Sequence, residues 1–296
     1  MIKRTIYIGN PAHLSLKQDQ MSVKLDEETK HTIPVEDIGI VVLDHPQATI
    51  THGLTNALIN NNAAVLWCDD KHMPNGLMLP LSGNDTFTEK LRYQVGASLP
   101  LKKQLWKQTV EAKINNQAAV LERFNIPGDA LRYMAAKVKS GDSENMEGRA
   151  AAYYWNHLLE EYETTRGREE GPPNHMLNYG YAVLRAVTAR SLTMSGFLPA
   201  LGIHHRNKYN PFCLADDVME PYRPVVDAWV MDYLEMVDEV PETLGKEEKA
   251  HLLKIPTLDV VIENKNSPLM VGMQRTTAGL MKCFEGSSKK IPYPVI

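Results

Sequence analysis

The spacing of apolar residues changes near residue 85, and this change constrains the fold more than any other feature of the chain. Before it, short β-like runs alternate with turn residues, and residues 21–25 alternate between apolar and polar as a half-exposed strand should. After it, almost the whole chain has helical periodicity. The sequence therefore predicts an α+β protein, with a small β-rich N-terminal domain followed by a larger all-α C-terminal domain.

The elements follow this division. Strands are expected at 4–8, 21–25, 38–43, 64–68 and 77–81, with a short helix at 53–60. Helices are expected at about 87–122, 128–139, 144–163, 174–200, 221–238 and 245–253, and a β-like run at 257–262 precedes a final helical stretch. We place a β-rich domain at 1–84, a helical domain at 85–286 and a flexible C-terminal tail at 287–296.

Composition indicates an ordinary globular protein. Hydrophobic residues make up 43% of the 296 positions and charged residues 23%, and no uninterrupted apolar run approaches the ~20 residues of a membrane span. Cys68, Cys213 and Cys283 are odd in number and lack C-x-x-C spacing, which predicts neither a disulfide framework nor a zinc site. We therefore expect a cytoplasmic protein that does not contact membrane.

The net charge of −4 does not by itself predict binding to nucleic acid. A local basic patch can still govern such a contact, whatever the overall charge. Short basic groups such as Arg206 with Lys208 are compatible with a patch of this kind, and equally with a solvated surface.

Glu147 is the carboxylate whose placement is hardest to explain as ordinary surface. In a helix over 146–162 it shares one face with the apolar residues Ala151 and Leu158. A carboxylate turned toward the protein interior must be paired or must shift its pKa, because removing its charge from water is costly. Two interpretations follow: a metal ligand, or a buried ion pair with Arg149 or Arg185.

Two later segments add an imidazole and a second carboxylate. His204 and His205 are adjacent, so on a helix they cannot face the same way, and His205 is either a ligand or a packing residue. Further along, helical spacing places four charged residues on one face, which is either part of a site or a solvated helix start: Asp216, Glu220, Arg223 and Asp227. Two carboxylates and an imidazole from separate segments would suit Mg²⁺ or Mn²⁺.

Four sequence motifs occur in order: Glu147-Gly148, the segment 174–182, Gly202-x-x-His205, and Asp217-x-x-Glu220-x-x-Arg223-Pro224. This combination resembles the CRISPR-associated integrase family, the "Cas one" proteins, and most closely its members from type II systems. The resemblance implies that Glu147, His205 and Glu220 bind the metal and are the catalytic residues. Some family members have aspartate at the last of these positions.

The resemblance also implies an activity: joining the 3′-hydroxyl ends of short foreign DNA fragments to a CRISPR repeat by transesterification, with Mg²⁺ or Mn²⁺ as cofactor. Asp217 and Tyr179 are candidates for a supporting layer behind the ligands. The candidate DNA contacts are Arg149, Arg206, Lys208 and Arg223.

The implied partners are double-stranded DNA, as foreign fragment and as CRISPR repeat, a second copy of the chain, and a dimer of a small ferredoxin-like CRISPR-associated protein. Unpaired sheet edges make the β-rich domain the expected dimer interface. Two other functions stay open: a stand-alone metal-dependent nuclease for branched or repair DNA, and a non-catalytic scaffold in which Glu147 and His205 are structural.

Overall fold

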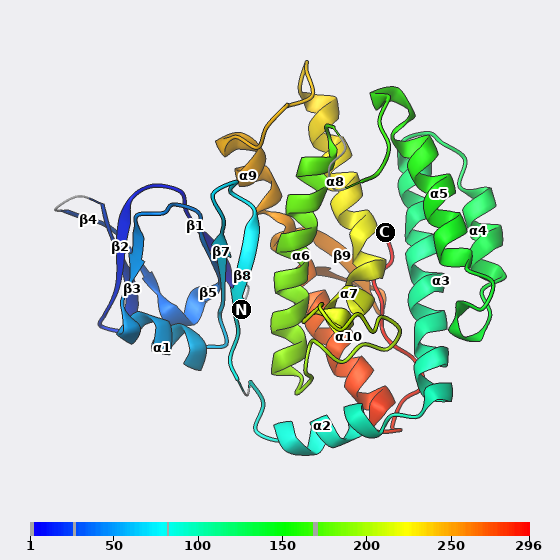
Figure 1. Cartoon of the computed structure of the whole chain (residues 1–296), viewed down its shortest axis with the longest axis horizontal. Coiled ribbons are helices and arrows are strands. Elements are labelled where there is room, and N and C mark those ends of the chain that lie inside the picture. The colour runs from blue at the N-terminus through cyan, green and yellow to red at the C-terminus, as the bar shows by residue number, and fades with distance from the viewer. Residues whose placement is uncertain (1–2, 26–27, 82, 168–170) are drawn as a thin grey trace. The chain divides into compact units, whose positions relative to one another are not determined.

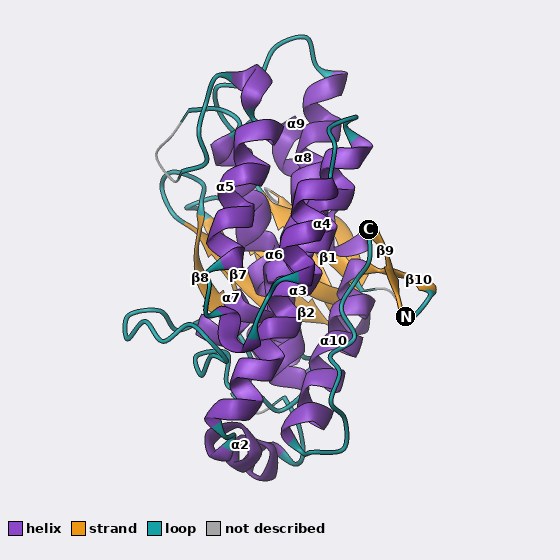
Figure 2. Cartoon of the chain, turned by 90° about the vertical axis from the view of Figure 1, so that its right-hand side faces the viewer, coloured by secondary structure: helices purple, strands orange, loops and turns teal. Residues whose placement is uncertain are grey.

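The computed structural model describes residues 3–25, 28–81, 83–167 and 171–296, which form two compact units, Met1–Asp85 and Thr86–Ile296 (Figure 1). The expected boundary after residue 84 lies one residue before this division. Strands dominate the first unit, and helices, purple in Figure 2, dominate the second. The predicted α+β class is confirmed.

The first unit contains two four-stranded sheets. One has the order β1-β5-β7-β8, in which β1, β5 and β7 are parallel and β8 is antiparallel to β7. The other has the order β4-β3-β2-β6. The bounds are β1 Arg4–Ile8, β2 Ala12–Lys17, β3 Gln20–Leu25, β4 Glu28–Pro34, β5 Ile38–Leu43, β6 Ala48–Ile50, β7 Ala64–Cys68 and β8 Pro74–Met78, with α1 at His52–Asn60 and a 3₁₀ turn, η1, at Val35–Asp37.

One apolar core holds this unit together. It combines Val41 from the first sheet, Leu14 and Met21 from the second, and Leu54 and Leu58 from α1, all with no exposed surface. Thr51 caps the start of α1, because its side chain accepts a hydrogen bond from the Leu54 backbone N–H. The apolar run of β5 is buried at every position: Ile38, Val41 and Leu43 lie in this core, while Ile40 and Val42 are buried outside it.

The second unit is a helical assembly around α3, α6 and α8. Helix α3 contacts α4, α5 and α8, and α6 contacts α7, α8 and α10. The helices are α2 Phe87–Gly96, α3 Leu99–Arg123, α4 Asp129–Ala136, α5 Met146–Leu158, α6 Asn174–Met194, α7 Cys213–Met219, α8 Arg223–Met236, α9 Lys246–Leu252 and α10 Leu269–Phe284. The 3₁₀ turns are η2 Ser140–Asp142, η3 Glu160–Tyr162, η4 Glu220–Tyr222 and η5 Ile255–Thr257, and the strands β9 Asp259–Ile262 and β10 Lys265–Pro268 form a hairpin.

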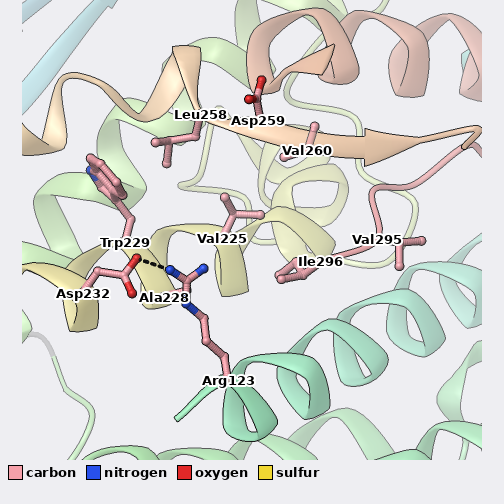
Figure 3. A pocket seen from close by; sticks show the side chains of 10 residues that line it. All are labelled: Arg123, Val225, Ala228, Trp229, Asp232, Leu258, Asp259, Val260, Val295 and Ile296. Atoms are coloured by element: carbon pink, nitrogen blue, oxygen red, sulfur yellow. Dashed lines mark hydrogen bonds and ion pairs between the residues drawn. The ribbon is translucent and has the colours of Figure 1, made fainter. Parts of the chain in front are cut away.

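The segment 287–296, expected to be a flexible tail, is packed along α3. The Tyr293 hydroxyl hydrogen-bonds Thr109 at 2.7 Å, and the Asn116 amide donates to the Pro294 carbonyl at 3.0 Å. Val295 and Ile296 line a cavity of about 200 Å³ beside Trp229 (Figure 3). The Thr276 hydroxyl of α10 donates in the same way to the Pro292 carbonyl, so side chains of two helices hold this segment.

Across the part of the chain that the structure describes, no helix is both long enough and apolar enough to span a membrane.

Candidate functional site

Glu147 lies in the first turn of α5, which a neighbouring carboxylate caps. Asp142 accepts hydrogen bonds from the backbone N–H groups of Met146, at 2.8 Å, and Glu147, at 3.0 Å. This occupies two of the N–H groups that a helix start leaves without partners. Glu147 is held at the edge of the buried face of α5, with 29% of its side chain exposed. Gly148 beside it makes room for the side chain of Asn145 rather than for a ligand.

The partner of Glu147 is Lys113, from the middle of α3. The two side chains form an ion pair, and the same Lys113 Nζ lies 2.6 Å from Glu220 Oε2. A single ammonium therefore joins a carboxylate on α5 to one on η4. The alternative of a buried pair with Arg149 or Arg185 is wrong, because the cation is a lysine 34 residues earlier in the chain.

Glu220 is buried, and two cations contact its two oxygens. Lys113 contacts Oε2, and Arg223 Nε lies 3.1 Å from Oε1. Burial alone would raise the pKa of this carboxyl, but Arg223 and Lys113 hold it below the ordinary value. The interpretation of this stretch as a solvated helix start is wrong, because Asp216, Glu220 and Asp227 are all buried.

His205 lies in the loop before α7, and Asp217 orients its ring. The His205 Nδ1 atom is 2.6 Å from Asp217 Oδ1, while Asp217 Oδ2 accepts hydrogen bonds from the backbone N–H groups of Ile203 and His204 at 2.6 and 2.9 Å. Gly202 permits this turn, since a Cβ there would overlap the His205 carbonyl oxygen and lie 2.8 Å from Asp217 Oδ2. One fully buried carboxylate thus fixes both the loop and the imidazole.

The hydrogen bond that Asp217 accepts also affects how the ring binds protons. It is the main reason that the pKa of His205 is raised above 6.5, and the charge of Glu220 adds to the effect. When neutral His205 donates Nδ1–H to Asp217, the lone pair of Nε2 is the one available to a metal. His204 stacks on Trp106 of α3, with ring centroids 4.3 Å apart, and the His205 ring meets the same Trp106 edge-on at 5.6 Å.

A cation holds Glu147 and Glu220 together, and His205 is near enough for its charge to influence Glu220. Within the described residues, no three histidine, cysteine or carboxylate side chains are grouped closely enough to hold a metal ion. The ammonium of Lys113 lies between the two glutamates instead. The donor set, two carboxylates and an imidazole, still fits a hard divalent cation.

The other candidates lie in different surroundings. Tyr179 is fully buried within α6, whereas Tyr181 reaches the site: its ring lies 4.7 Å from the Arg223 guanidinium. Arg149, Arg206 and Lys208 are exposed, as residues that bind DNA would have to be.

Sequence reasoning missed Lys113, although the sequence carries a signal for it. Trp106, Val110, Lys113, Gln117 and Leu121 follow helical spacing along α3, and each is buried. A lysine and a glutamine therefore interrupt an otherwise apolar face. Buried lysine is rare unless it is paired, so this interruption could have predicted a carboxylate partner.

Comparison with known proteins gives one family. A family model described as "CRISPR associated protein Cas1" matches residues 6–264. A protein of Neisseria meningitidis serogroup C (strain 8013), named CRISPR-associated endonuclease Cas1, is 36% identical over 299 residues, covering 100% of this chain and 97% of its own length.

Solved structures share the fold. A casposase bound to its integration product has a TM-score of 0.79 at 19% identity, covering 98% of this chain and 92% of that one. A chain of a Cas6-RT-Cas1–Cas2 complex has a TM-score of 0.73 at 19% identity, covering 97% of this chain and 35% of that one.

Proposed function

Because the chain belongs to the CRISPR-associated Cas1 family, we propose that it is a metal-dependent DNA integrase of CRISPR adaptation. It joins the 3′-hydroxyl ends of short foreign DNA fragments to the CRISPR repeat. The observation that carries the proposal is the convergence of Glu147 and Glu220 on one cation position, beside a histidine that a buried aspartate orients. The same residues can cut DNA when water replaces the hydroxyl.

Glu147, Glu220 and His205 Nε2 would hold Mg²⁺ or Mn²⁺. When bound, the metal would supply positive charge to the scissile phosphate and to the attacking and leaving oxygens. Arg223 keeps Glu220 ionised, and Asp217 keeps the His205 ring in the orientation and tautomer that a ligand requires. Arg149, Arg206 and Lys208 would bind DNA phosphates around this centre.

The reaction needs no energy source. The incoming 3′-oxygen loses its proton and forms a new bond to phosphorus, while the existing phosphodiester P–O bond breaks and its oxygen takes up a proton. One phosphodiester replaces another. The residues of the site therefore need only to bind, orient and stabilise charge.

For partners, we propose double-stranded DNA, a homodimer, and a dimer of the small ferredoxin-like CRISPR-associated protein. A Cas1–Cas2 assembly among the solved structures of the same fold supports the last of these. The β-rich unit would supply the dimer interface. The second candidate function is a stand-alone nuclease for branched or repair DNA; the Neisseria relative, a CRISPR-associated endonuclease, supports the cutting of DNA in general.

A disintegration assay tests the proposal without any partner protein. Branched DNA carrying one half-site product is incubated with Mn²⁺ and the wild type, with His205→Ala, or with Glu144→Gln. Glu144 is an exposed carboxylate three residues before Glu147 that pairs with Lys139, so its variant is the matched control. We expect release and rejoining of strands by the wild type and the control, and a loss of about 100-fold or more in His205→Ala.

Cleavage without rejoining would favour the stand-alone nuclease. Rejoining that survives in His205→Ala would remove His205 from the site. Titration calorimetry with Mn²⁺ addresses the scaffold alternative, because a scaffold would show no binding that Glu147→Ala abolishes.

A further inference from the structure

A polar cavity of about 260 Å³ adjoins the candidate metal site. Lys113 and Arg223, the two cations that hold Glu220, also line this cavity, together with Gln117, Arg166, Tyr181 and Asp227. The volume is below the ~300 Å³ at which sites for drug-sized ligands begin. The cavity therefore suits a small group next to the reacting centre.

Arg166 is fixed by neutral groups. Its guanidinium donates to the carbonyl of Gly167 and to the side-chain oxygen of Asn174, both at 2.9 Å, and to that of Asn178 at 2.8 Å. It also lies over the rings of Trp155 and Tyr181, with 5.6 and 5.2 Å to the centroids. Among the residues that the structure describes, no carboxylate forms an ion pair with it. A guanidinium held in place without its charge being neutralised is prepared to bind an anion.

The balance of charge in the cavity favours the same kind of ligand. Lys113 and Arg223 are already paired with Glu147 and Glu220, so Arg166 is left opposite the carboxyl group that lines the cavity, Asp227. Both oxygens of Asp227 already accept hydrogen bonds, from the hydroxyls of Tyr154 and Tyr181. Burial raises the pKa of Asp227 to about 6, which further reduces the negative charge that it contributes near neutral pH.

Gln117 supplies a second, independent observation. Its side chain is 2% exposed and its Oε1 atom has no hydrogen-bond partner within the described structure. It lies one helical turn after Lys113 and lines the same cavity. A buried amide oxygen without a partner is costly unless a ligand or water supplies a donor. A hydroxyl group would satisfy it.

We propose that this cavity binds the sugar–phosphate end of a DNA strand, with Arg166 as the phosphate anchor and Gln117 as acceptor for the sugar hydroxyl. The inference rests on the proposed function, because it assigns to the DNA integrase the place where a strand end is held beside Glu147 and Glu220. Arg166 and Gln117 are then positioning residues for the strand, and neither belongs to the proposed metal ligands.

The test measures binding of a fluorescein-labelled single-stranded oligonucleotide, in EDTA, by fluorescence anisotropy. Arg166→Met should weaken binding about tenfold to hundredfold, the range expected when a charge-assisted hydrogen bond is removed. The slope of log affinity against log salt should fall by about 0.7 for each phosphate that the variant no longer binds. Arg123→Met is the matched control, since Arg123 is an exposed arginine of the same unit whose partner is Asp232.

A second variant keeps the inference testable if Arg166→Met disturbs the fold. Gln117→Met should abolish a preference of the wild type for an oligonucleotide ending in a 3′-hydroxyl over one ending in a dideoxy sugar. Affinity within twofold of the wild type and an unchanged salt slope in Arg166→Met would overturn the assignment, as would equal binding of both ends by the wild type.

Mn²⁺ titration separates this result from a failure of the proposed function. Arg166→Met should bind Mn²⁺ as the wild type does, because Arg166 contacts none of the proposed ligands. If Arg166→Met loses oligonucleotide binding but still binds Mn²⁺, the result supports the role of the cavity in DNA binding independently of the metal site. If the wild type binds the oligonucleotide but no Mn²⁺, the metal-dependent function fails while the cavity stands.

Discussion

Replacing Lys113 by methionine should tighten Mn²⁺ binding and, at the same time, destabilise the metal-free protein. Lys113 Nζ lies between Glu147 and Glu220, where a divalent cation would have to bind. In the wild type, a metal must displace this ammonium and so breaks two ion pairs. In Lys113→Met there is nothing to displace, and the two carboxylates repel each other until a cation binds.

The expected size of the effect follows from burial. Only 9% of the Lys113 side chain is exposed, and removing one partner of a buried ion pair costs about 3–5 kcal/mol. We expect the free energy of unfolding of the metal-free variant to fall by about that amount. A displaced ammonium recovers part of this energy by contacting water, so we expect about 1.4–2.8 kcal/mol to appear as affinity, a 10- to 100-fold lower Kd.

Titration calorimetry with Mn²⁺ and urea denaturation with and without Mn²⁺ measure both effects. Lys107→Met is the matched control, because it removes a lysine from the same helix. Lys107 Nζ lies 3.4 Å from Glu111 Oε1, and both side chains are 35% exposed. Such a pair contributes little, so both the Mn²⁺ affinity and the unfolding free energy should stay close to those of the wild type. Wild-type protein that binds Mn²⁺ no more weakly than Lys113→Met would refute competition between lysine and metal.

Three further predictions concern the protons of His205 and of two buried carboxyl groups. Asp217→Asn should weaken Mn²⁺ binding about 10- to 100-fold, measured by calorimetry. An amide N–H facing His205 Nδ1 would place the ring proton on Nε2, the atom proposed to bind the metal. Unchanged affinity would show that Asp217 does not set the tautomer. The wild-type affinity itself should fall as the pH drops through the His205 pKa, which lies above 6.5, because the protonated ring has no lone pair for a metal; a profile that is flat across this range would remove the imidazole from the ligands. Asp227 has its pKa raised from 3.8 to about 6, so the folded state holds its proton more tightly and wild-type stability is lost as the pH rises through this window. Relative to the wild type, Asp227→Asn should therefore gain about 3 kcal/mol in unfolding free energy between pH 3 and 7, and parallel stability curves in urea denaturation would contradict this.

Much of the fold could be predicted because its signals are local. The apolar run of β5 and the alternation of β3 mark strands that need no knowledge of the rest of the chain. The break between α2 and α3 was missed, and we expected one helix over 87–122. The signals there were also local: Ser98 accepts a hydrogen bond from the Leu101 N–H, and Pro100 belongs in a first helical turn. Strands β2, β4 and β6 and helix α7 were missed as well, and the strand expected at 77–81 lies at Pro74–Met78.

The site was less predictable because its contacts are long-range. Sequence periodicity showed that Glu147 needed a partner, but it could not distinguish Arg149 or Arg185 from Lys113. The choice depends on how α3 packs against α5 and η4, which no local pattern encodes. The same holds for the segment 287–296, expected to be flexible, because the groups that bind it come from α3 and α10. Asp217 was a candidate to support His205, and the structure adds that it also holds the backbone of the loop.

Helix α3 sets the distances between three side chains of the site and its adjoining cavity, because all three lie on it. At 1.5 Å per residue, Trp106 beside the histidines lies about 10 Å along the axis from Lys113, and Lys113 lies about 6 Å from Gln117. A rigid rod does not permit one of these intervals to be adjusted alone, since inserting a residue would rotate every later side chain by about 100°. A substitution in α3 can therefore change the length or charge of one of these side chains while the spacing between them stays the same.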